Sequence, residues 1–309
     1  MVSKTILELC NRILADYDLA TKLTVEEINE LIERLIFLMK GKPILERIKN
    51  GSALVVGDIH GDFNILKSII EGFIKNDHIN HMIFLGDIVD RGSQSIGCLN
   101  LLYALIIKYP ERVHIVRGNH EAISVNSRYG FLDDIRNFCD LSETKENTAN
   151  NSLPELYVNF NRSFGTMPLA LVHEEFRYFF VHAGIPIDPI SLKEINDLPK
   201  ADLLLSNPTI KQMLWNDPRE GVEKYSLSIR GDGIYVYGHE VVDNFLGKNN
   251  LKMIIRAHEV IPDGHIYLFN KKLLSLFTSE DFYQGVSGKI AKITDKGKIK
   301  IFHPLTNLY

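Results

Sequence analysis

Five short apolar segments, each ending in side chains that can bind a metal ion, constrain this chain more than any other feature. They are SALVVGD, HMIFLGD, VHIVRGN, RYFFVHAG and MIIRAHE, at residues 52–58, 81–87, 113–119, 177–184 and 253–259. The first three alternate with helical patterns near 62–75 and 95–109, which is typical of an α/β fold with parallel strands. We therefore predict an α/β fold with polar groups at the carboxyl ends of its strands, where such sheets bind ligands.

The polar groups at these five ends are two aspartates, one asparagine and three histidines. They are Asp58, His60, Asp87, Asn119, His182 and His258. Each alone has an ordinary explanation, such as a helix-capping aspartate or a core histidine, but packing requirements alone do not produce five such ends. Carboxylate, amide oxygen and imidazole suit Mn²⁺, Fe, Co²⁺, Ni²⁺ or Zn²⁺, and six ligands exceed what one tetrahedral ion takes. The set predicts two ions that share a bridging carboxylate, as in phosphatases and nucleases.

The remaining pattern predicts a single catalytic domain, residues 49–309, with a helical N-terminal cap, residues 1–48, packed on it. The cap has two amphipathic helices. The second is predicted to begin at Thr24, which forms a capping box with Glu27 three residues later. After residue 264, short alternating strands indicate an antiparallel meander that completes the sheet system. The polar, aperiodic residues 140–152 predict a surface loop or insertion.

Composition argues against several classes of function. The net charge is −4, whereas nucleic-acid binders usually show a basic stripe, so we expect no nucleic-acid partner. No apolar run is long enough to span a membrane, and the N-terminus lacks the pattern of a signal peptide. Three scattered cysteines form no disulfide framework, so we expect a reducing, cytoplasmic location.

At this point the motifs resemble those of a known family, the phosphoprotein phosphatase (PPP) family. The likeness is carried by GDIHG, GDIVDRG, RGNHE, HAG, RG and RAHE, at residues 57–61, 86–92, 117–121, 182–184, 230–231 and 256–259. YGF, LWNDP, HEVVDNFL and LFTS extend it, so that it runs from about residue 50 to 305. The resemblance implies a metallophosphoesterase fold, a central β-sandwich of mixed sheets flanked by helices. It also implies a two-metal hydrolase that acts on phosphoserine and phosphothreonine in proteins by in-line attack of a metal-bridging hydroxide.

The resemblance further implies a role for each matching residue. At the metals, Asp58 and His60 would bind the first ion, Asp87 would bridge both, and Asn119, His182 and His258 would complete the second. His120 resembles the general acid, oriented by Asp90, although its place beside Asn119 also allows a role as a further ligand of the second ion. Arg91 and Arg230, together with Asn119, resemble phosphate-binding residues. Instead of binding phosphate, Arg91 could simply form an ion pair with Asp90.

Three departures from the family pattern affect the substrate. HAG stands where HGG is usual and also occurs in bacterial dinucleoside tetraphosphatases, and RAHE replaces RAHQ. In LFTSEDFY the aligned position of the usual tyrosine is Phe282, with Tyr283 one residue later, which puts that tyrosine's contact in question. These features resemble an archaeal or bacterial member of the superfamily.

Three functions therefore remain open. The first is dephosphorylation of proteins, with phosphoprotein substrates as partners. The second is hydrolysis of dinucleoside polyphosphates or other small phosphoesters, which predicts aromatic stacking on a base by Tyr235, Tyr237, Phe282 or Tyr283. The third is a non-catalytic scaffold, which the intact ligand set disfavours. We expect two divalent ions, with Mn²⁺ active in vitro and Fe, Zn²⁺, Co²⁺ or Ni²⁺ as further candidates; the sequence identifies no regulatory subunit.

Overall fold

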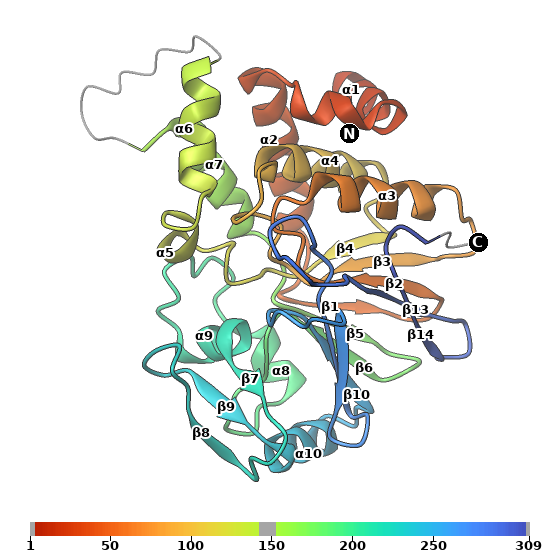
Figure 1. The fold of residues 1–309 in the computed structure, drawn as a ribbon, viewed down its shortest axis with the longest axis vertical. Helices are drawn as coiled ribbons and strands as arrows, with labels where there is room; N and C mark the ends of the chain where they lie inside the picture. The colour runs from red at the N-terminus through yellow and green to blue at the C-terminus, as the bar shows by residue number, and fades with distance from the viewer. Residues whose placement is uncertain (1–3, 142–152, 307–309) are drawn as a thin grey trace.

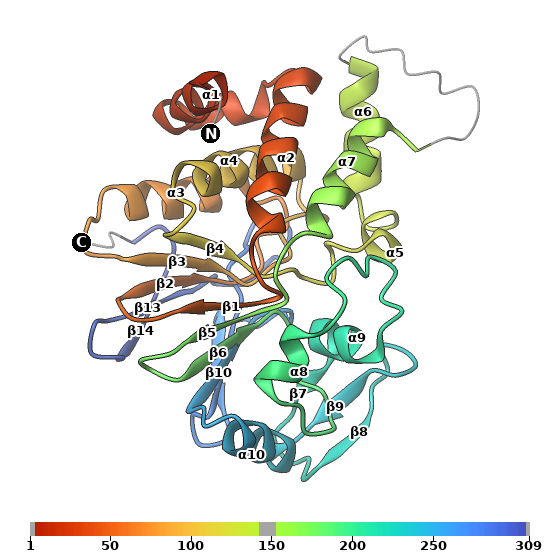
Figure 2. The same cartoon turned by 180° about the vertical axis from the view of Figure 1, so that it is seen from behind.

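The computed structural model describes residues 4–141 and 153–306, which fold into a β-sandwich with helices on both outer faces (Figures 1 and 2). One sheet has six strands in the order β1 (Leu45–Ile48), β5 (Ala170–His173), β6 (Tyr178–Val181), β10 (Met253–Arg256), β12 (Leu273–Leu276) and β11 (His265–Leu268). The other has five, in the order β14 (Ile299–Phe302), β13 (Ile290–Ile293), β2 (Ala53–Val56), β3 (His81–Phe84) and β4 (Val113–Ile115). Both sheets mix parallel and antiparallel pairs, so the predicted fold class is confirmed.

Helices and a small third sheet surround the sandwich. The third sheet has the order β7 (Asp217–Pro218), β9 (Tyr235–Tyr237) and β8 (Tyr225–Leu227). The helices on the side of the five-stranded sheet are α1 (Lys4–Ala15), α2 (Val25–Lys40), α3 (Phe63–Ile74), α4 (Ser95–Lys108), α6 (Phe131–Leu141) and α7 (Glu155–Phe164), with the 3₁₀ segment η1 (Tyr17–Thr21). The remaining helices are α5 (Ile123–Asn126), α8 (Leu192–Asn196), α9 (Pro208–Trp215) and α10 (His239–Lys248).

Alternation along the central strands divides the core into three layers. In β2, Ala53 and Val55 pack between the two sheets, whereas Leu54 and Val56 face the helices that cover the five-stranded sheet. In β6, Phe180 faces the other sheet, and its two neighbours face the layer that contains α9 and α10. Because side chains alternate between the faces of a strand, a strand that is covered on both sides has to be apolar throughout.

The N-terminal helices form as the sequence predicts. Thr24 caps α2, and the capping box with Glu27 is present. Both α1 and α2 pack on α4 (Figure 2). Residues Leu45–Ile48, which precede the predicted boundary at 48, form β1 and pair with β5 in the six-stranded sheet. The division into a cap and a catalytic domain stays a prediction.

The predicted C-terminal meander is wrong. The four strands after residue 264 form two hairpins that belong to different sheets: β11–β12 in the six-stranded sheet and β13–β14 in the five-stranded sheet. Moreover, β12 runs parallel to β10. Every residue of β12 is buried, because Leu273 faces the layer of α9 and α10 while Leu274 and Leu276 face the other sheet. A strand covered on both faces belongs inside the sandwich, not in a meander added to its outside. The predicted polar loop 140–152 overlaps the end of α6 through Leu141; the rest lies outside the described residues.

Candidate metal centre

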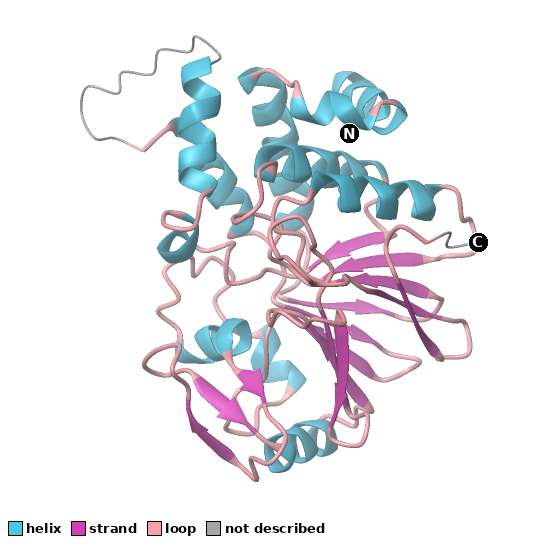
Figure 3. Cartoon of the chain, viewed as in Figure 1, coloured by secondary structure: helices cyan, strands magenta, loops and turns pink. Residues whose placement is uncertain are grey.

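The loops after five strands bring all six predicted ligands together. Asp58 and His60 follow β2, Asp87 follows β3, Asn119 follows β4, and His182 and His258 follow β6 and β10 of the other sheet. The strands of the two sheets end at a common region of loops (Figure 3). Each of these side chains is buried, with at most 9% exposure, and the ion pairs and hydrogen bonds between them link all six.

The first group of ligand atoms surrounds the imidazole of His60. Its Nε2 lies 3.8 Å from Asp58 Oδ2 and 3.7 Å from Asp87 Oδ2. The Nδ1 of His60 is 2.9 Å from the carbonyl oxygen of Val89, so Nδ1 carries the proton and the Nε2 lone pair faces the carboxylates. Among the described residues, Asp58 Oδ2 is buried without a hydrogen-bond partner. An orphaned carboxylate oxygen beside an imidazole lone pair fits a bound cation.

The second group gathers around Asn119. Its Oδ1 lies 2.8 Å from His182 Nε2 and 2.9 Å from His258 Nδ1. The Nε2 of His182 is also 3.4 Å from Asp87 Oδ2, while its Nδ1 bonds to the carbonyl oxygen of Leu85 at 2.8 Å. Asp87 Oδ2 thus belongs to both groups. The resemblance to the PPP family implies a bridging carboxylate at this residue, and that role stays a prediction.

The electrostatics of the pocket call for added positive charge. Burial raises the pKa of Asp58 to about 7, and the neighbouring Asp87 carboxylate contributes to this increase. Burial lowers the pKa of His60 to about 3, and the neighbouring His120 contributes to this decrease. His60 is therefore a neutral imidazole, the form that binds a metal. Burial lowers the pKa of His182, but the Asp87 carboxylate outweighs it and raises that pKa to about 9. Two buried carboxylates so close together are stabilised by divalent cations.

His120 and Asp90 form a second feature of the pocket. The Nδ1 of His120 is 2.6 Å from Asp90 Oδ2, and Asp90 Oδ1 accepts the backbone N–H of Phe131 at 2.8 Å. The Nε2 of His120 points toward the bridging position, 3.9 Å from Asp87 Oδ2. Although burial opposes it, the carboxylates of Asp87 and Asp90 raise the pKa of His120. The imidazole is therefore held in one orientation and favoured in its protonated form.

The two predicted arginines are positioned differently. Arg91 is exposed, with its guanidinium 4.4 Å from the ring centre of Tyr129 and 5.9 Å from that of Phe282. Because Asp90 uses its oxygens on His120 and Phe131, the simple Asp90–Arg91 ion pair is not formed among the described residues.

Arg230 is held through a chain of charges. Its Nε donates to Asp217 Oδ2 at 2.6 Å, and the other oxygen of Asp217 accepts from the buried Arg256 at 2.8 Å. Arg256 also pairs with Glu259 at 3.1 Å. The glutamate of the unusual RAHE motif therefore has a structural partner, and Arg256 acts by holding Asp217.

The backbone is strained at the ligand loops. His60, Asp87 and His258 have φ of 45°, 53° and 75°, and Asp90 and Arg91 have 71° and 73°. Such left-handed conformations cost energy for residues other than glycine and concentrate at functional sites. The loop that contains Gly118 can approach Asp87 only because residue 118 has no side chain, since a Cβ there would lie 2.2 Å from Asp87 Oδ1.

Two acidic residues that we did not predict as site residues hold these loops. Glu121 accepts the backbone N–H groups of Asp87, Ile88 and Gly118 at 2.8–2.9 Å. Asp62 caps α3 and accepts the N–H groups of both Glu280 and Asp281 at 3.0 Å. Each follows a predicted ligand by two positions, Asn119 and His60 respectively, and this proximity is a local signal that the sequence offers.

The aromatic departure at Phe282 and Tyr283 also has a structural counterpart. The ring of Tyr283 lies 5.9 Å from the ring of His60, whereas Phe282 is 50% exposed and lies beside Arg91. Tyr283, one residue beyond the aligned position, is therefore the member of the pair that lies beside the predicted ligand His60.

A profile of the calcineurin-like phosphoesterase family matches residues 52–262 of this chain, a range that includes all six ligands. The chain belongs to the calcineurin-like phosphoesterase family. This confirms the sequence-based assignment to metallophosphoesterases, and the family implies divalent metal ions at the site. The donor set described above, with its orphaned carboxylate oxygen, fits such ions.

Two relatives place this phosphoesterase near the serine/threonine phosphatases. A protein of Encephalitozoon cuniculi, named as a probable serine/threonine-protein phosphatase, is 28% identical over 299 residues, which cover 90% of this chain and 62% of that protein. The chain thus spans 62% of the length of that relative. The second relative is a serine/threonine phosphatase from Saccharomyces cerevisiae whose structure is described as similar to human phosphatase PP5. It superposes on this chain with a TM-score of 0.77 and 25% sequence identity, and the match covers 91% of this chain and 90% of the yeast chain.

A more distant likeness shows the fold alone. A cold-active protein-tyrosine phosphatase from a Shewanella species has a TM-score of 0.57 and 17% identity and covers 85% of this phosphoesterase and 83% of its own chain. The archaeal or bacterial affinity of the present chain stays a prediction. None of the described helices combines the length and apolar character that a membrane span requires.

Proposed function

We propose that this chain is a phosphoprotein phosphatase that removes phosphate from serine and threonine residues with the help of two divalent metal ions. The observation that carries the proposal is the shared position of Asp87 Oδ2, which lies 3.7 Å from His60 Nε2 and 3.4 Å from His182 Nε2. A single carboxylate between two groups of ligands is the arrangement expected of a two-metal site.

The ligands divide as the geometry groups them. Asp58, His60 and Asp87 would hold one ion, and Asp87, Asn119, His182 and His258 would hold the other. Bound divalent ions would neutralise the phosphoester and lower the pKa of a coordinated water. The donor set admits Mn²⁺, Fe, Zn²⁺, Co²⁺ or Ni²⁺, and we expect Mn²⁺ to support activity in vitro.

His120 would donate the proton that the leaving alkoxide needs. Its Nδ1 is engaged by Asp90 at 2.6 Å, which leaves the Nε2–H of the protonated ring free to face the pocket. Because alkoxide is a poor leaving group, a positioned proton donor typically contributes about 10²–10⁴-fold to the rate. Asp90 would hold the ring in orientation and favour its protonated form.

Arg91, Arg230 and Asn119 would bind the phosphoryl oxygens. Arginine offers permanently charged, forked donors that match phosphate. Arg91 has its guanidinium exposed beside two aromatic rings, and Arg230 is set by Asp217 with its side chain 32% exposed. Both are thus accessible to an incoming anion.

The protein substrate is supported by the two serine/threonine phosphatase relatives. The competing dinucleotide substrate predicts base stacking on Tyr235, Tyr237, Phe282 or Tyr283. Tyr237 is fully buried and Tyr235 packs edge-on against Tyr225 at 5.6 Å. Phe282, which is 50% exposed beside Arg91, is the ring that such a substrate would use. We also propose a reducing, cytoplasmic location, because Cys10, Cys98 and Cys139 are all free thiols.

The test compares kcat/KM for a phosphothreonine peptide and for diadenosine tetraphosphate after chelation and reloading with Mn²⁺. Preference for the peptide is the expected result, and preference for the dinucleotide would overturn the protein substrate. His120→Asn should lower kcat strongly for the peptide and much less for p-nitrophenyl phosphate, whose leaving group needs little proton donation. Metal analysis of the same variant decides its role: loss of one ion would show that His120 is a ligand.

Asp87→Asn provides the complementary test of the bridging position. Replacing the shared carboxylate by an amide removes its charge from both groups, so we expect both ions to be lost and activity with them. Retention of two ions per chain, measured by metal analysis, would contradict the assignment of Asp87.

A further inference from the structure

The two arginines that would bind phosphate are anchored by different kinds of contact. Arg230 donates to Asp217 at 2.6 Å, so part of its guanidinium already serves a carboxylate. Arg91 is exposed, and among the described residues no carboxylate lies within ion-pair distance of its guanidinium. That group instead lies over two aromatic rings, 4.4 Å from the ring centre of Tyr129 and 5.9 Å from that of Phe282. Aromatic rings are therefore the contacts that orient Arg91.

The ring of Tyr129 is held close to Arg91 by hydrogen bonds between their two loops. The backbone N–H of Arg91 donates to the carbonyl oxygen of Tyr129 at 3.2 Å. The preceding residue, Asp90, accepts the backbone N–H of Phe131 at 2.8 Å. These two bonds fix the loop before α6 against the loop after β3, so the position of the Tyr129 ring does not depend on the ring contact itself.

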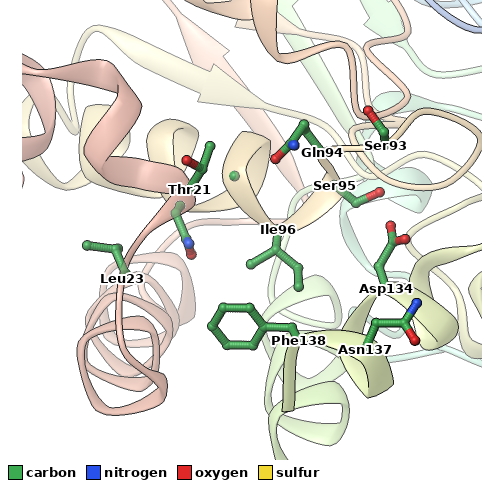
Figure 4. Close-up of a pocket in the computed structure, with 11 residues that line it drawn as sticks. Thr21, Leu23, Ser93, Gln94, Ser95, Ile96, Asp134, Asn137 and Phe138 are labelled. Carbon is green, nitrogen blue, oxygen red and sulfur yellow. The ribbon is translucent and has the colours of Figure 1, made fainter. Parts of the chain in front are cut away.

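The helices that follow these two loops are separated in part by an open space. A cavity of about 320 Å³ lies between the start of α4 and α6 (Figure 4). Ser93, two positions after Arg91, lines one side of it, and Asn137 and Phe138 of α6 line another. Because side chains leave this space open, we attribute the position of Tyr129 to the hydrogen bonds between the loops.

An aromatic contact suits a phosphate-binding arginine better than a carboxylate does. The guanidinium group has five N–H donors, and a carboxylate beside it occupies some of them and offsets part of its charge. A ring face attracts the cation through its quadrupole and leaves the N–H groups in the guanidinium plane free. The donors and the charge of Arg91 therefore remain available to the oxygens of a phosphoryl group.

The phenylalanine at position 282 can contribute only such a ring. It has no hydroxyl group, so it cannot donate a hydrogen bond to phosphate, and its side chain is exposed beside Arg91. Its ring lies edge-on to that of Tyr283 at 5.1 Å, and Tyr283 in turn lies beside His60. Phe282 therefore links the guanidinium of Arg91 to an aromatic side chain beside a predicted metal ligand.

We propose that Tyr129 and Phe282 are positioning residues, which hold the guanidinium of Arg91 over their rings so that its N–H groups face the phosphoryl group of the substrate. The inference rests on the proposed phosphatase function, in which Arg91 binds phosphate. Without the rings an exposed arginine side chain is mobile, and phosphate binding has to order it. An exposed cation–π contact is worth about two- to fivefold in an equilibrium constant, so each ring should contribute a factor of that size to phosphate affinity.

The first measurement is the Kd of inorganic phosphate for the Mn²⁺-loaded full chain, by calorimetry, which needs no turnover. Tyr129→Leu removes the ring and should weaken phosphate binding about two- to fivefold, whereas Tyr129→Phe keeps the ring and should bind phosphate like wild type. Phe282→Leu should weaken binding to a similar extent. Equal losses in Tyr129→Leu and Tyr129→Phe would mean that the hydroxyl group matters and would overturn the proposal, as would a wild-type chain that binds no phosphate.

Phe37→Leu is the matched control. The guanidinium of Arg34 lies 4.8 Å from the ring centre of Phe37 on the helix α2, and Phe37 is an exposed side chain. The variant therefore loses a similar exposed contact in the outer helical layer, and its Kd for phosphate should equal that of wild type. A loss as large as that of Tyr129→Leu would contradict the proposal, because removal of any surface ring would then have the same effect.

A double-variant comparison tests whether the rings act through Arg91. In an Arg91→Ala background, Tyr129→Leu and Phe282→Leu should cause no further loss of phosphate affinity, because the group that the rings position is absent. The same loss in both backgrounds would show that the rings affect phosphate by another route and would overturn the proposal.

Kinetics separate this role from an effect on the proton donor, because the ring of Tyr129 also lies 5.4 Å from that of His120. Loss of positioning at Arg91 should raise KM for both p-nitrophenyl phosphate and a phosphothreonine peptide. An effect through His120 would instead lower kcat, far more for the peptide than for the aryl ester, and would overturn the role assigned to Tyr129. If the chain hydrolyses the aryl ester but no phosphopeptide, the protein substrate is refuted, while a raised KM for the aryl ester in Tyr129→Leu still supports the role of the rings.

Discussion

Asp62 offers the sharpest link between a single side chain and the shape of the substrate-binding region. One carboxylate oxygen caps α3 through the N–H of Ile65 at 3.1 Å, and the other accepts the N–H groups of Glu280 and Asp281 at 3.0 Å. The side chain is 3% exposed. The segment that it anchors continues directly into Phe282 and Tyr283, so Asp62 determines where those two rings lie.

Asp62→Asn keeps the size of the side chain but replaces one acceptor oxygen by an NH₂ group. Whichever way the amide turns, at least one backbone N–H then faces a donor, and the remaining bonds lose their charge assistance. With about 1 kcal/mol for a neutral hydrogen bond and about 1.5–3 kcal/mol for a bond to a charged group, the free energy of unfolding should fall by roughly 2–4 kcal/mol. At about 2–4 °C per kcal/mol, Tm should fall by roughly 5–15 °C.

The local effect is measured by hydrogen exchange and by kinetics. The amides of Glu280 and Asp281 should exchange faster, and KM for a phosphopeptide should rise about tenfold, because small displacements of positioning groups cost substantial rate. Thr24→Ala is the control: it removes the cap of α2, worth about 1 kcal/mol, and should leave KM unchanged. Unchanged exchange at residues 280–281 together with unchanged KM in Asp62→Asn would refute the reasoning.

Two further predictions concern charge. Because the pKa values of Asp58 and His182 are raised to about 7 and about 9 in the metal-free protein, metal binding must displace protons. Raising pH through this range removes the competing protons, so the increase in Tm on adding Mn²⁺ should be larger at pH 8 than at pH 5; an equal increase would contradict it. Asp217→Asn removes the charge that holds Arg230 at 2.6 Å, so KM should rise and stability should fall by about 3 kcal/mol or more, as for a broken buried pair. The control is Asp243→Asn, which breaks an exposed ion pair with Lys272 and should lower the free energy of unfolding by about 1 kcal/mol at most. If both variants lose the same small amount, the Asp217 ion pairs do not stabilise the protein as proposed.

That the six predicted metal ligands lie together could be anticipated from the sequence, because each follows the end of a strand. A buried strand ends, and the next residues lie at the carboxyl edge of the sheet. Asp58 and Asp87 each come two or three residues after the last residue of β2 or β3. Since β2 and β3 are parallel neighbours, their ends meet without any further information. The distances between these side chains follow from sheet geometry.

The C-terminal strands show where such a rule stops. Alternation identified the four strands but not their partners, and pairing decides the sheet. β12 lies between β10 and β11, whereas β13 lies between β2 and β14. Leu273–Leu276 is buried along its whole length, and the two adjacent leucines at its start, which interrupt the alternation, were the available signal against an outer meander.

The residues that hold the site were missed for the same physical reason. Asp62 bonds to Glu280 across 218 positions of sequence, and Arg256 bonds to Asp217 across 39. An acidic residue near a ligand motif carries no local sign of such a partner, because the partner is set by the packing of two sheets. The approximate place of each predicted ligand depends on where a single strand ends, whereas the exact position of its loop depends on hydrogen bonds between distant segments. Substitution of the distant partners should therefore alter KM and stability before it alters metal content, and substitution of the ligands should do the reverse.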